Sequence, residues 1–364
     1  MITVLHLIPT LEGGGAERQL AILAKEQARR GWKVHIGLRR CGGVNERIVR
    51  DSGVVIHQLG DLKYLHPKLI IYIRALIRRT KPDLMQTWLS QMDILGGVVA
   101  WWCSVPWIVS ERSSSLAYQR TSLINMLRSY FSKGANAIIS NSRQGANYWH
   151  QVLPRHRHVL TIHNAVDVSA VRSVAPKRFE DLDTGKKYVL SVGRLEAVKG
   201  QGTLVRAVNL MPDRKDLRVL IIGNGPLRRE LEAMVRAYGL NENISLLSYH
   251  PDWWGWLKTA SGLVSTSRWE GCPNVVLEAM AAGCPTIVSD IPGHREILDD
   301  SSALFVPRDN PTALAAAIGS LLSDKESASQ RALGASLRVE NSTIARVADA
   351  YASVYEEILE SEFL

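Results

Sequence analysis

The stretch SGLVSTSRWEGCPNVVLEAMAAGCPTIVSD, residues 261–290, contains a complete strand–helix–strand unit. Its two apolar ends have the length of short buried strands, and the apolar run 274–282, set between a proline and a glycine, predicts a helix. Two strands joined through a helix lie parallel in one sheet. Glu278 stands in the middle of this helix, where a carboxylate is costly unless a polar partner receives it.

The same alternation continues on both sides of this unit. Strands of the first series are expected at 3–9, 33–38, 54–59, 82–88, 106–111 and 135–142, with a first helix at 16–30. After a polar stretch, strands of the second series are expected at 187–194, 217–225, 243–249, 261–267 and 285–290. Helices are expected between them at 202–211, 226–238, 252–259 and 274–282, and then at 311–322 and 344–359.

This order predicts an α/β protein with two doubly wound, Rossmann-like domains that face each other across a cleft. A length of 364 residues also favours two domains. We expect an N-terminal domain at 1–170 and a C-terminal domain at 171–364, with a last helix that can cross back to the first domain. Ligands of such sheets bind at the carboxyl ends of the strands.

The composition, 46% hydrophobic and 22% charged, is that of a globular protein. Four cysteines without metal-site or disulfide spacing favour a reducing, cytoplasmic setting. The start of the chain has no basic leader or cleavage site, so we expect no secretory signal. The uncharged run 94–110 is short for a membrane span and contains Pro106 and two glycines. We predict instead a buried helix that ends near Cys103, followed by a strand.

Positive charge is concentrated in the first half of the chain. Residues 1–175 hold 23 Lys and Arg against 10 Asp and Glu, a balance of 23 − 10 = +13, and the remainder holds 21 against 25, or −4. Such a surface attracts nucleic acid, anionic lipid or a polyphosphate ligand. The alternative is a solvated face without a partner. The size of the asymmetry favours an anionic partner.

Three glycines follow the first expected strand, in the segment PTLEGGGAERQL (9–20). Gly14 and Gly15 allow close backbone approach where a helix begins, and the amides of such a turn suit an anion. Tight turns need glycine without any ligand as well. Glu17, in the first helical turn, is expected to interact favourably with the helix dipole.

Two cations follow the first strand of the second series, in SVGRLEAVKGQGTL (191–204). Arg194 offers a planar guanidinium and Lys199 a compact ammonium, and together they suit a diphosphate. The alternative is a loop with two solvated cations.

The opening stretch carries two glutamates eight residues apart. Glu270 ends the loop after a strand, while Glu278 faces inward from the helix, and the turn between them leads to Pro273, Asn274 and Val275 at the helix N-terminus. A vicinal diol such as a ribose suits Glu278, because two hydroxyls can donate to one carboxylate. The alternative partner is a neighbouring strand or a buried arginine.

Taken in order, GGGAER, SVGRLEAVKG and EGCPNVVLEAMAAGCPTIVSD resemble the family 4 retaining glycosyltransferases, which have the GT-B fold of two Rossmann-like domains. The resemblance covers nearly the whole chain. It implies a hexosyltransferase whose C-terminal domain binds a nucleotide-sugar, with a UDP-sugar as the first expectation, and whose N-terminal domain binds the acceptor. Relatives with GGAER often extend polyprenyl-diphosphate-linked glycans.

The resemblance also implies roles for the residues of these motifs. Arg194 and Lys199 would hold the donor diphosphate, Glu270 would contact the transferred sugar, and Glu278 would receive the ribose hydroxyls. Amides near Pro273, Asn274 and Val275 would approach the sugar or the phosphates, and Gly14 and Gly15 would let the N-terminal domain close over the donor. No cofactor or bound metal is implied, because cations stand where a metal would act and the Asp-rich metal motif is absent.

One position departs from the family pattern. Many relatives carry a histidine after the strand that corresponds to WIVSER, and this chain carries Arg112 there, followed by Ser113, Ser114 and Ser115. Arg112 suits an acidic sugar or an acceptor phosphate. The alternative is a salt bridge to a nearby carboxylate.

The segment YIRALIRR has the pattern of an amphipathic helix, with Arg74, Arg78, Arg79 and Lys81 close together. We expect it to dock on the cytoplasmic face of a membrane, with a solvated helix face as the alternative. The rival functions are a sugar-nucleotide epimerase of the same fold and a basic nucleic-acid-binding module. No nucleic acid partner is expected, because interleaved aromatic and basic motifs are missing. The ten tryptophans would stack on sugars or fill cores.

Overall fold

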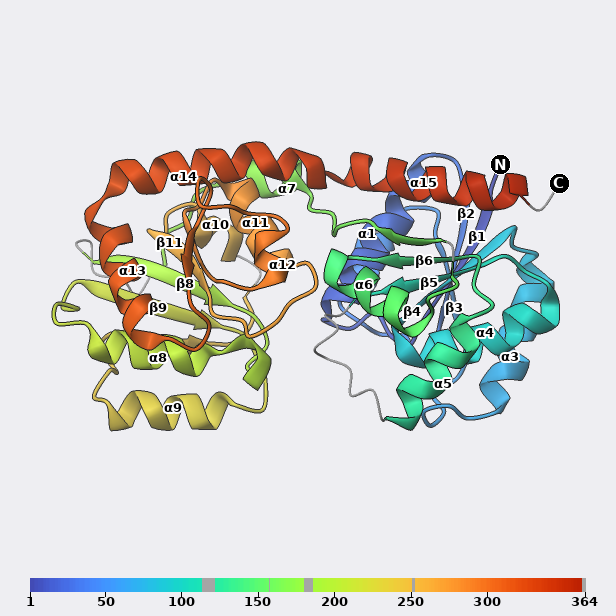
Figure 1. The fold of residues 1–364 in the computed structure, drawn as a ribbon, viewed down its shortest axis with the longest axis horizontal. Coiled ribbons are helices and arrows are strands. Elements are labelled where there is room, and N and C mark those ends of the chain that lie inside the picture. Colours follow the sequence, from blue (N-terminus) through green and yellow to red (C-terminus); the bar gives the residue numbers. More distant parts are fainter. Residues whose placement is uncertain (113–121, 157, 180–185, 251–252, 362–364) are drawn as a thin grey trace. The chain divides into compact units, whose positions relative to one another are not determined.

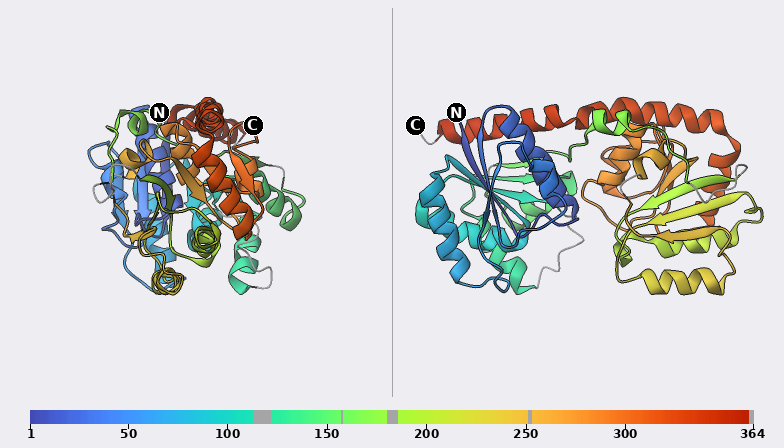
Figure 2. Two further views of the ribbon diagram at one scale, coloured as in Figure 1. Left: turned by 90° about the vertical axis from the view of Figure 1, so that its left-hand side faces the viewer. Right: turned by 180° about the vertical axis from the view of Figure 1, so that it is seen from behind.

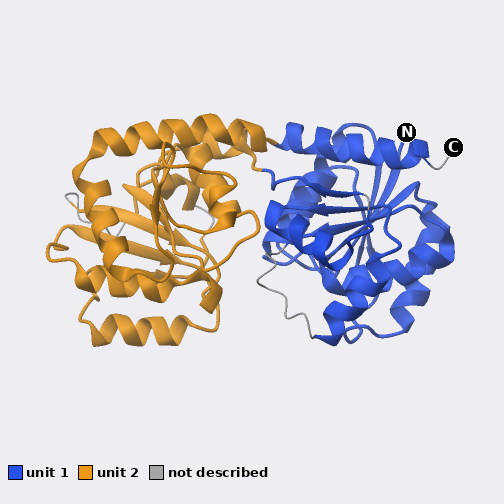
Figure 3. Ribbon diagram, in the orientation of Figure 1, with its two compact units in different colours: residues 1–165, 344–364 blue, residues 166–343 orange. Residues whose placement is uncertain are grey.

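A computed structural model describes residues 1–112, 122–156, 158–179, 186–250 and 253–361 of the chain. They form two compact units (Figure 3). Unit 1 comprises residues 1–165 and 344–364, and unit 2 comprises residues 166–343. The division falls at 165/166, five residues before the expected 170/171, because Val166 pairs with Thr343 in a short parallel bridge. Residues 344–364 belong with the N-terminal segment.

The sheet of unit 1 has seven parallel strands in the order β3-β2-β1-β4-β5-β6-β7. β1 is continuous in its apolar character, as expected for a strand buried on both faces. The bounds are β1 Thr3–Ile8, β2 Lys33–Leu38, β3 Val55–Gln58, β4 Leu84–Trp88, β5 Trp107–Glu111, β6 Ala137–Ser140 and β7 Val159–Thr161.

Helices cover both faces of this sheet (Figure 1). One hydrophobic cluster contains residues of α1, α2 and α15, and a second, on the other face, contains residues of α3, α4 and α6, while α5 packs on α4. The bounds are α1 Gly15–Arg29, α2 Glu46–Val49, α3 Lys68–Thr80, α4 Leu89–Cys103, α5 Leu123–Ser132, α6 Arg143–Val152 and α15 Ile344–Ser361. The run 94–110 thus forms the end of a helix and then a strand, as predicted.

A chain of buried hydrogen bonds links helix α15 to the rest of unit 1. The donor and the acceptor of each bond in this chain can be assigned. An indole nitrogen only donates, so Trp88 donates to Nδ1 of His6, and Nε2 of His6 must then donate to Gln27. Gln27 donates to the hydroxyl of Tyr355 on α15, which donates to Gln86, which in turn donates to Ser110. Burial lowers the pKa of His6 to about 4, so its ring is neutral.

Unit 2 repeats the architecture with six parallel strands in the order β10-β9-β8-β11-β12-β13. The bounds are β8 Lys187–Val192, β9 Leu217–Ile222, β10 Ile244–Leu247, β11 Gly262–Ser265, β12 Thr286–Ser289 and β13 Leu304–Val306. The two units therefore confirm the predicted fold class.

The helices of unit 2 lie in two layers (Figures 1 and 2). Residues of α8, α9 and α13 share one hydrophobic cluster, and residues of α7, α10, α11 and η3, with Ala335 of α14, share the other. The bounds are α7 Val168–Ser173, η2 Ala197–Lys199, α8 Gln201–Leu210, α9 Arg228–Ala237, α10 Trp253–Leu257, α11 Asn274–Ala282, α12 Pro292–Arg295, α13 Pro311–Ser323, α14 Lys325–Arg338 and η3 Val339–Ser342.

In the sheet of unit 2, the side on which successive strands are added changes between β8 and β11. From β8 the sheet grows to β9 and β10 on one side, and to β11, β12 and β13 on the other. The loops that leave the carboxyl ends of β8 and β11 diverge at this switch point, which is where doubly wound sheets bind ligands.

Candidate active site

Lys199 and Glu270 meet at the carboxyl edge of the sheet of unit 2. Lys199 ends the short helix after β8, and its Nζ lies 2.5 Å from Oε1 of Glu270, in the loop after β11. The hydroxyl of Ser267 donates to the same Oε1 at 2.6 Å. Burial opposes the charge on Glu270, but the ammonium and these hydrogen bonds outweigh it and lower its pKa. The carboxylate of Glu270 is therefore ionised at neutral pH.

The backbone holds these two loops together. Thr266 donates its hydroxyl to the carbonyl of Lys199 at 2.9 Å, and the amide of Arg268 donates to the carbonyl of Val198 at 2.7 Å. Gly200 has a φ of +64°, and a Cβ atom there would stand 2.2 Å from the carbonyl oxygen of Thr266. Only glycine fits both the backbone conformation and this close approach.

Arg194 lies in the same loop, but its guanidinium has a different partner. It forms an ion pair with Glu196, and its side chain is 68% exposed. Its carbonyl accepts a hydrogen bond from the side chain of Gln201 at 2.9 Å, which fixes the backbone. Of the two cations predicted for a diphosphate, the structure therefore brings only Lys199 to Glu270.

The helix after Glu270 has the predicted bounds, Asn274–Ala282, with Pro273 as the residue before it. Glu278 is 2% exposed within this helix, and Asn274 and Val275 form its first turn. The predicted inward position of Glu278 is thus confirmed. The roles of Pro273, Asn274, Val275 and Glu278 in donor binding stay predictions.

A histidine that the sequence analysis did not single out lies behind this loop. His294, in the short helix after β12, is fully buried, with Nδ1 2.7 Å from the carbonyl of Ser289 and Nε2 3.2 Å from the hydroxyl of Ser265. Its sequence signal was its place directly after β12, at the same edge of the sheet as Glu270.

Unit 1 places the glycine-rich turn at the start of α1. The amide of Gly14 donates to the carboxylate of Glu17, which also accepts the hydroxyl of Thr10. Glu17 therefore caps the start of α1 by accepting the amide of Gly14, which is one half of a capping box, because glycine has no side chain to accept the amide of Glu17 in return. Gly15 is the first residue of the helix.

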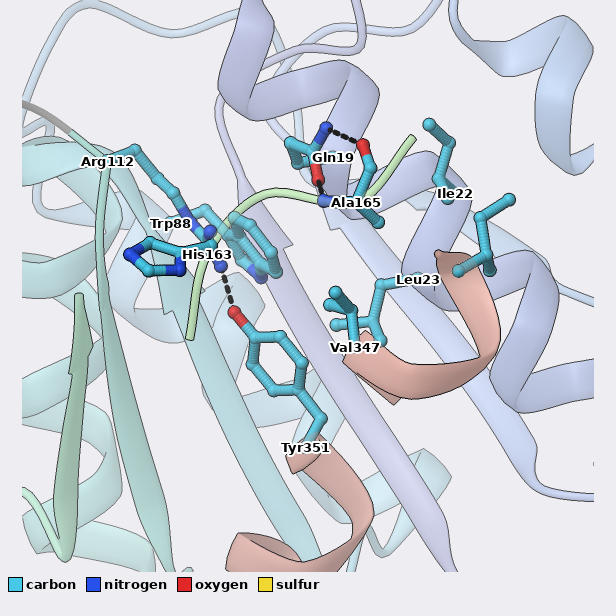
Figure 4. A pocket seen from close by; sticks show the side chains of 10 residues that line it. Gln19, Ile22, Leu23, Trp88, Arg112, His163, Ala165, Val347 and Tyr351 are labelled. Atoms are coloured by element: carbon cyan, nitrogen blue, oxygen red, sulfur yellow. Dashed lines mark hydrogen bonds between the residues drawn. The ribbon is translucent and has the colours of Figure 1, made fainter. Parts of the chain in front are cut away.

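Arg112 lies in a small pocket of unit 1 with a volume of about 10 Å³, close to that of one water molecule (Figure 4). It donates to Asn164 at 3.2 Å and to the hydroxyl of Tyr351 on α15, and its guanidinium stacks on Trp88 at 4.3 Å. Among the described residues, the hydrogen-bond partners of the Arg112 guanidinium are the side-chain amide of Asn164 and the phenol of Tyr351, and neither is a carboxylate. Ser113, Ser114 and Ser115 lie outside the described residues.

A buried group of three charges lies at the carboxyl edge of the sheet of unit 1. Arg128 of α5 pairs with Asp93 of α4 at 2.7 Å and with Glu111 of β5 at 2.9 Å, and all three side chains are at most 3% exposed. Thr87 donates to Asp93 at 2.6 Å, and Trp149 donates to Glu111 at 3.0 Å. Burial raises the pKa of Asp93 to about 6, against the attraction of Arg128.

The described residues contain no group of three or more His, Cys, Asp or Glu side chains arranged to hold a metal ion. A search of the same residues finds no helix with the length and apolar character needed to span a membrane.

Two family models match the chain. Residues 13–170 match the model described as Glycosyltransferase Family 4, and residues 175–335 match the model described as Glycosyl transferases group 1. Both models describe glycosyltransferases and together they span most of residues 13–335, so the chain belongs to the glycosyltransferases, with the family 4 match in its N-terminal half. Its two Rossmann-like units have the GT-B fold.

Two relatives illustrate the similarity. The chain is 30% identical over 165 residues to the N-acetylgalactosamine-N,N'-diacetylbacillosaminyl-diphospho-undecaprenol 4-alpha-N-acetylgalactosaminyltransferase of Campylobacter jejuni, across 45% of this chain and 44% of that one. It is 29% identical over 193 residues to the lipopolysaccharide core biosynthesis mannosyltransferase LpsB of Rhizobium meliloti, across 50% of this chain and 55% of that one. The match thus spans about half the length of these curated relatives.

Solved structures share the fold over almost the whole chain. A crystal structure of Anabaena HepE in complex with UDP and glucose superposes with a TM-score of 0.86 at 17% identity and covers 98% of this chain and 100% of that one. The sucrose-phosphate synthase of Thermosynechococcus elongatus superposes with a TM-score of 0.82 at 21% identity, over 99% and 100% of the two chains. At such identities the likeness concerns the fold.

Proposed function

We propose that this chain moves a hexosyl group from a nucleotide-sugar, with a UDP-sugar as the first expectation, to a glycan or glycolipid acceptor, with retention of the anomeric configuration. The observation that carries the proposal is the Lys199–Glu270 pair at the switch point of the sheet of unit 2. The match of residues 13–170 to the family 4 model and the UDP and glucose bound to the HepE structure support a donor of this kind.

In the proposed reaction, the bond between the anomeric carbon and the diphosphate breaks with its electrons on the diphosphate. The acceptor oxygen bonds to that carbon from the same face and loses its proton to the departing diphosphate oxygen. Lys199 stabilises the charge that develops on the diphosphate, and Arg194 joins it once its guanidinium leaves Glu196. A preorganised ammonium lowers the barrier because it does not have to reorganise during the reaction.

Glu270 has capacity to bind the sugar. Lys199 and Ser267 both donate to its Oε1, and a carboxylate offers about four lone-pair sites in all. The remaining sites suit the hydroxyls of the transferred hexose. Glu278, buried in α11, receives the ribose hydroxyls, and the first turn of α11 approaches the phosphates. Lys199 and Arg194 supply the charge that a metal supplies elsewhere, so we propose a metal-independent enzyme.

The test of the donor site is a thermal-shift panel of UDP-, GDP-, ADP- and dTDP-sugars. At about 100 times its Kd, a ligand stabilises the native state by roughly 2.7 kcal/mol. One nucleotide should raise the melting temperature of the wild type, and Glu278→Gln should abolish the effect. Lys215→Ala is the matched control, because Lys215 is exposed and precedes β9 at the opposite edge of the sheet. Absence of a shift with every nucleotide contradicts the proposal.

The same preparation tests the reaction itself. Transfer should continue in a chelator if no metal is needed, and the product should keep the anomeric configuration of the donor. An epimerase of the same fold would instead convert the nucleotide-sugar without any acceptor. Epimerised nucleotide-sugar in an acceptor-free reaction would therefore replace the proposed function with that alternative.

We further propose that the acceptor is an anionic, polyprenyl-diphosphate-linked glycan or glycolipid, met at the cytoplasmic face of a membrane. The excess positive charge of the first half of the chain supports it, as does the diphospho-undecaprenol substrate in the name of the Campylobacter relative. Each Lys or Arg near anionic lipid contributes roughly 1 kcal/mol.

The outer surface of α3, α4 and α5 gives this proposal a structural basis. Trp101 and Trp102, at the end of α4, are 88% and 53% exposed, and Arg74 of α3 stacks on Trp102 at 3.9 Å. Tyr130 of α5 is also exposed, and Lys133 lies over its ring at 5.4 Å. Aromatic rings beside cations suit the boundary between lipid headgroups and acyl chains. Trp101 and Trp102 therefore do not fill a core.

Sedimentation with vesicles tests this surface. The wild type should bind vesicles of phosphatidylcholine with phosphatidylglycerol and stay in solution with phosphatidylcholine alone. Trp101→Ala should weaken the binding, whereas Tyr249→Ala, which removes an exposed ring of unit 2, should bind as the wild type does. A wild type that remains in the supernatant with both vesicles contradicts membrane docking and leaves donor binding untouched.

A further inference from the structure

The loop that carries Glu270 rests on the end of strand β12. Ser289, the last residue of β12, donates its hydroxyl to the carbonyl of Ser267. Gly293, four residues after β12, lies so close to the loop that a Cβ atom there would stand 2.6 Å from the carbonyl oxygen of Glu270. The position of Glu270 therefore depends on the backbone that follows β12 as well as on its own loop.

His294 joins the ends of β11 and β12. A carbonyl only accepts, so Nδ1 of His294 must carry the proton that it donates to the carbonyl of Ser289 at 2.7 Å. In the neutral ring Nε2 is then an acceptor, and the hydroxyl of Ser265, the last residue of β11, donates to it at 3.2 Å. One imidazole thus bridges the ends of two neighbouring strands in a single tautomer.

Burial keeps the ring of His294 neutral although two carboxylates lie nearby. Glu270 and Asp290 attract a proton to His294, while Lys199 repels it, and burial lowers the pKa of the ring overall. A protonated ring would add a third charge beside the Lys199–Glu270 pair and compete with Lys199 for Glu270. A neutral ring holds the loop without disturbing that pair.

We propose that His294, as the neutral Nδ1–H tautomer, is a positioning residue that fixes Glu270 opposite Lys199 and acts on the reaction only through this pair. The proposal deepens the proposed function and rests on it for its kinetic consequence. A contact made in the transition state is sensitive to misplacement, and an error of about 1 Å can cost about 100-fold in rate.

Three substitutions distinguish the loss of the hydrogen bonds of His294 from the loss of its side-chain volume. In His294→Asn, the side-chain amide can still donate to the carbonyl of Ser289; His294→Gln offers an amide nearer Ser265; His294→Leu offers neither bond. We expect kcat to fall about 10- to 100-fold in His294→Leu with little change in the KM for the donor, and to recover most of that loss in His294→Asn. His150→Leu, on the exposed side of α6 in unit 1, is the matched control.

Wild-type kcat in His294→Leu, at a temperature well below its melting point, would overturn the proposal, as would equal losses in the Leu and Asn variants. If the His294 variants do not fold, Ser289→Ala removes one hydroxyl of the same support and should lower kcat while the fold persists. An unchanged kcat in this variant also overturns the proposal.

Nitrogen-15 spectra of the histidine rings test the structural part without any substrate. The wild type at neutral pH should show His294 with a protonated Nδ1 and an unprotonated Nε2. The opposite tautomer or an imidazolium overturns the proposal. A wild type with the expected tautomer but no transferase activity would instead count against the proposed function, so the two failures are distinguishable.

Discussion

The carboxyl edges of the two sheets both carry charged side chains, but they use them differently. In unit 1, Arg128 forms ion pairs with Asp93 and Glu111, and all three side chains are buried. In unit 2, Lys199 and Glu270 pair while 28% and 14% of their side chains remain exposed. A closed set of charges can hold helices on a sheet, whereas a pair that keeps contact with solvent can exchange partners with a ligand. The same topological position therefore holds a closed group of charges in unit 1 and, in the proposed function, the reactive pair of unit 2.

The largest expected effect comes from removing the cation from the buried group of Asp93, Glu111 and Arg128. Arg128→Met leaves two buried carboxylates without their shared cation, so the unfolding free energy should fall by about 3–5 kcal/mol. Urea unfolding followed by circular dichroism measures it. Lys199→Ala, tested alongside, should unfold close to the wild type, because its partner can turn to solvent. Equal stability of Arg128→Met and the wild type would refute the division between the two edges.

Lys199→Ala should have its effect on activity. Loss of one preorganised donor to the developing charge should lower kcat/KM by roughly 100- to 1000-fold, equivalent to about 2.7–4 kcal/mol in the activation free energy. Transfer of radiolabelled sugar measures it, with Lys215→Ala as the control. A loss below tenfold would mean that Lys199 matters only for the position of Glu270.

The buried chain that holds α15 gives a smaller effect. Tyr355→Phe removes the hydroxyl that links Gln27 to Gln86 and leaves buried groups unsatisfied, so it should cost about 1–3 kcal/mol of unfolding free energy. Amide hydrogen exchange in α15 should accelerate correspondingly. Tyr238→Phe, an exposed position after α9, is the control. Unchanged exchange in α15 would show that apolar packing alone holds this helix.

The last effect is a change in pH dependence on replacing Asp93. The native state keeps a proton on Asp93 up to about pH 6, while the unfolded chain releases it near 3.8. The contribution of Asp93 to the unfolding free energy therefore falls as the pH rises from about 4 to about 6. Asp93→Asn lacks this contribution and still leaves Glu111 to pair with Arg128. The stability of the wild type relative to Asp93→Asn should decline across this window, and parallel curves would contradict it.

The sequence predicted most of the fold, because apolar runs bounded by turn residues are local signals. Helix α11 has its predicted bounds since Pro273 and Gly283 mark both ends. Strands β7 and β13 were not predicted, because three residues each are too few to show a pattern. Helix α14 was not predicted, because its sequence is mainly polar.

The candidate site was predictable in its residues but not in its pairings. Lys199 and Glu270 were each singled out, yet they are 71 residues apart and meet only because β8 and β11 are neighbours. Arg194 forms an ion pair with Glu196, two residues away. Arg112 donates a hydrogen bond to Tyr351, which is 239 residues away in the sequence. A lone histidine such as His294 gives no periodic signal, and its role depends on the order of the strands.

The hydrogen-bonded chain from Trp88 to Tyr355 also bears on the order in which the chain folds during synthesis. Unit 2 is continuous, residues 166–343, so all of its strands are available before the last helix leaves the ribosome. The first 165 residues emerge earlier but lack α15, whose apolar side completes a core with α1. We therefore expect the first 165 residues to complete their core only after α15 has been made, whereas N-terminal domains usually mature first.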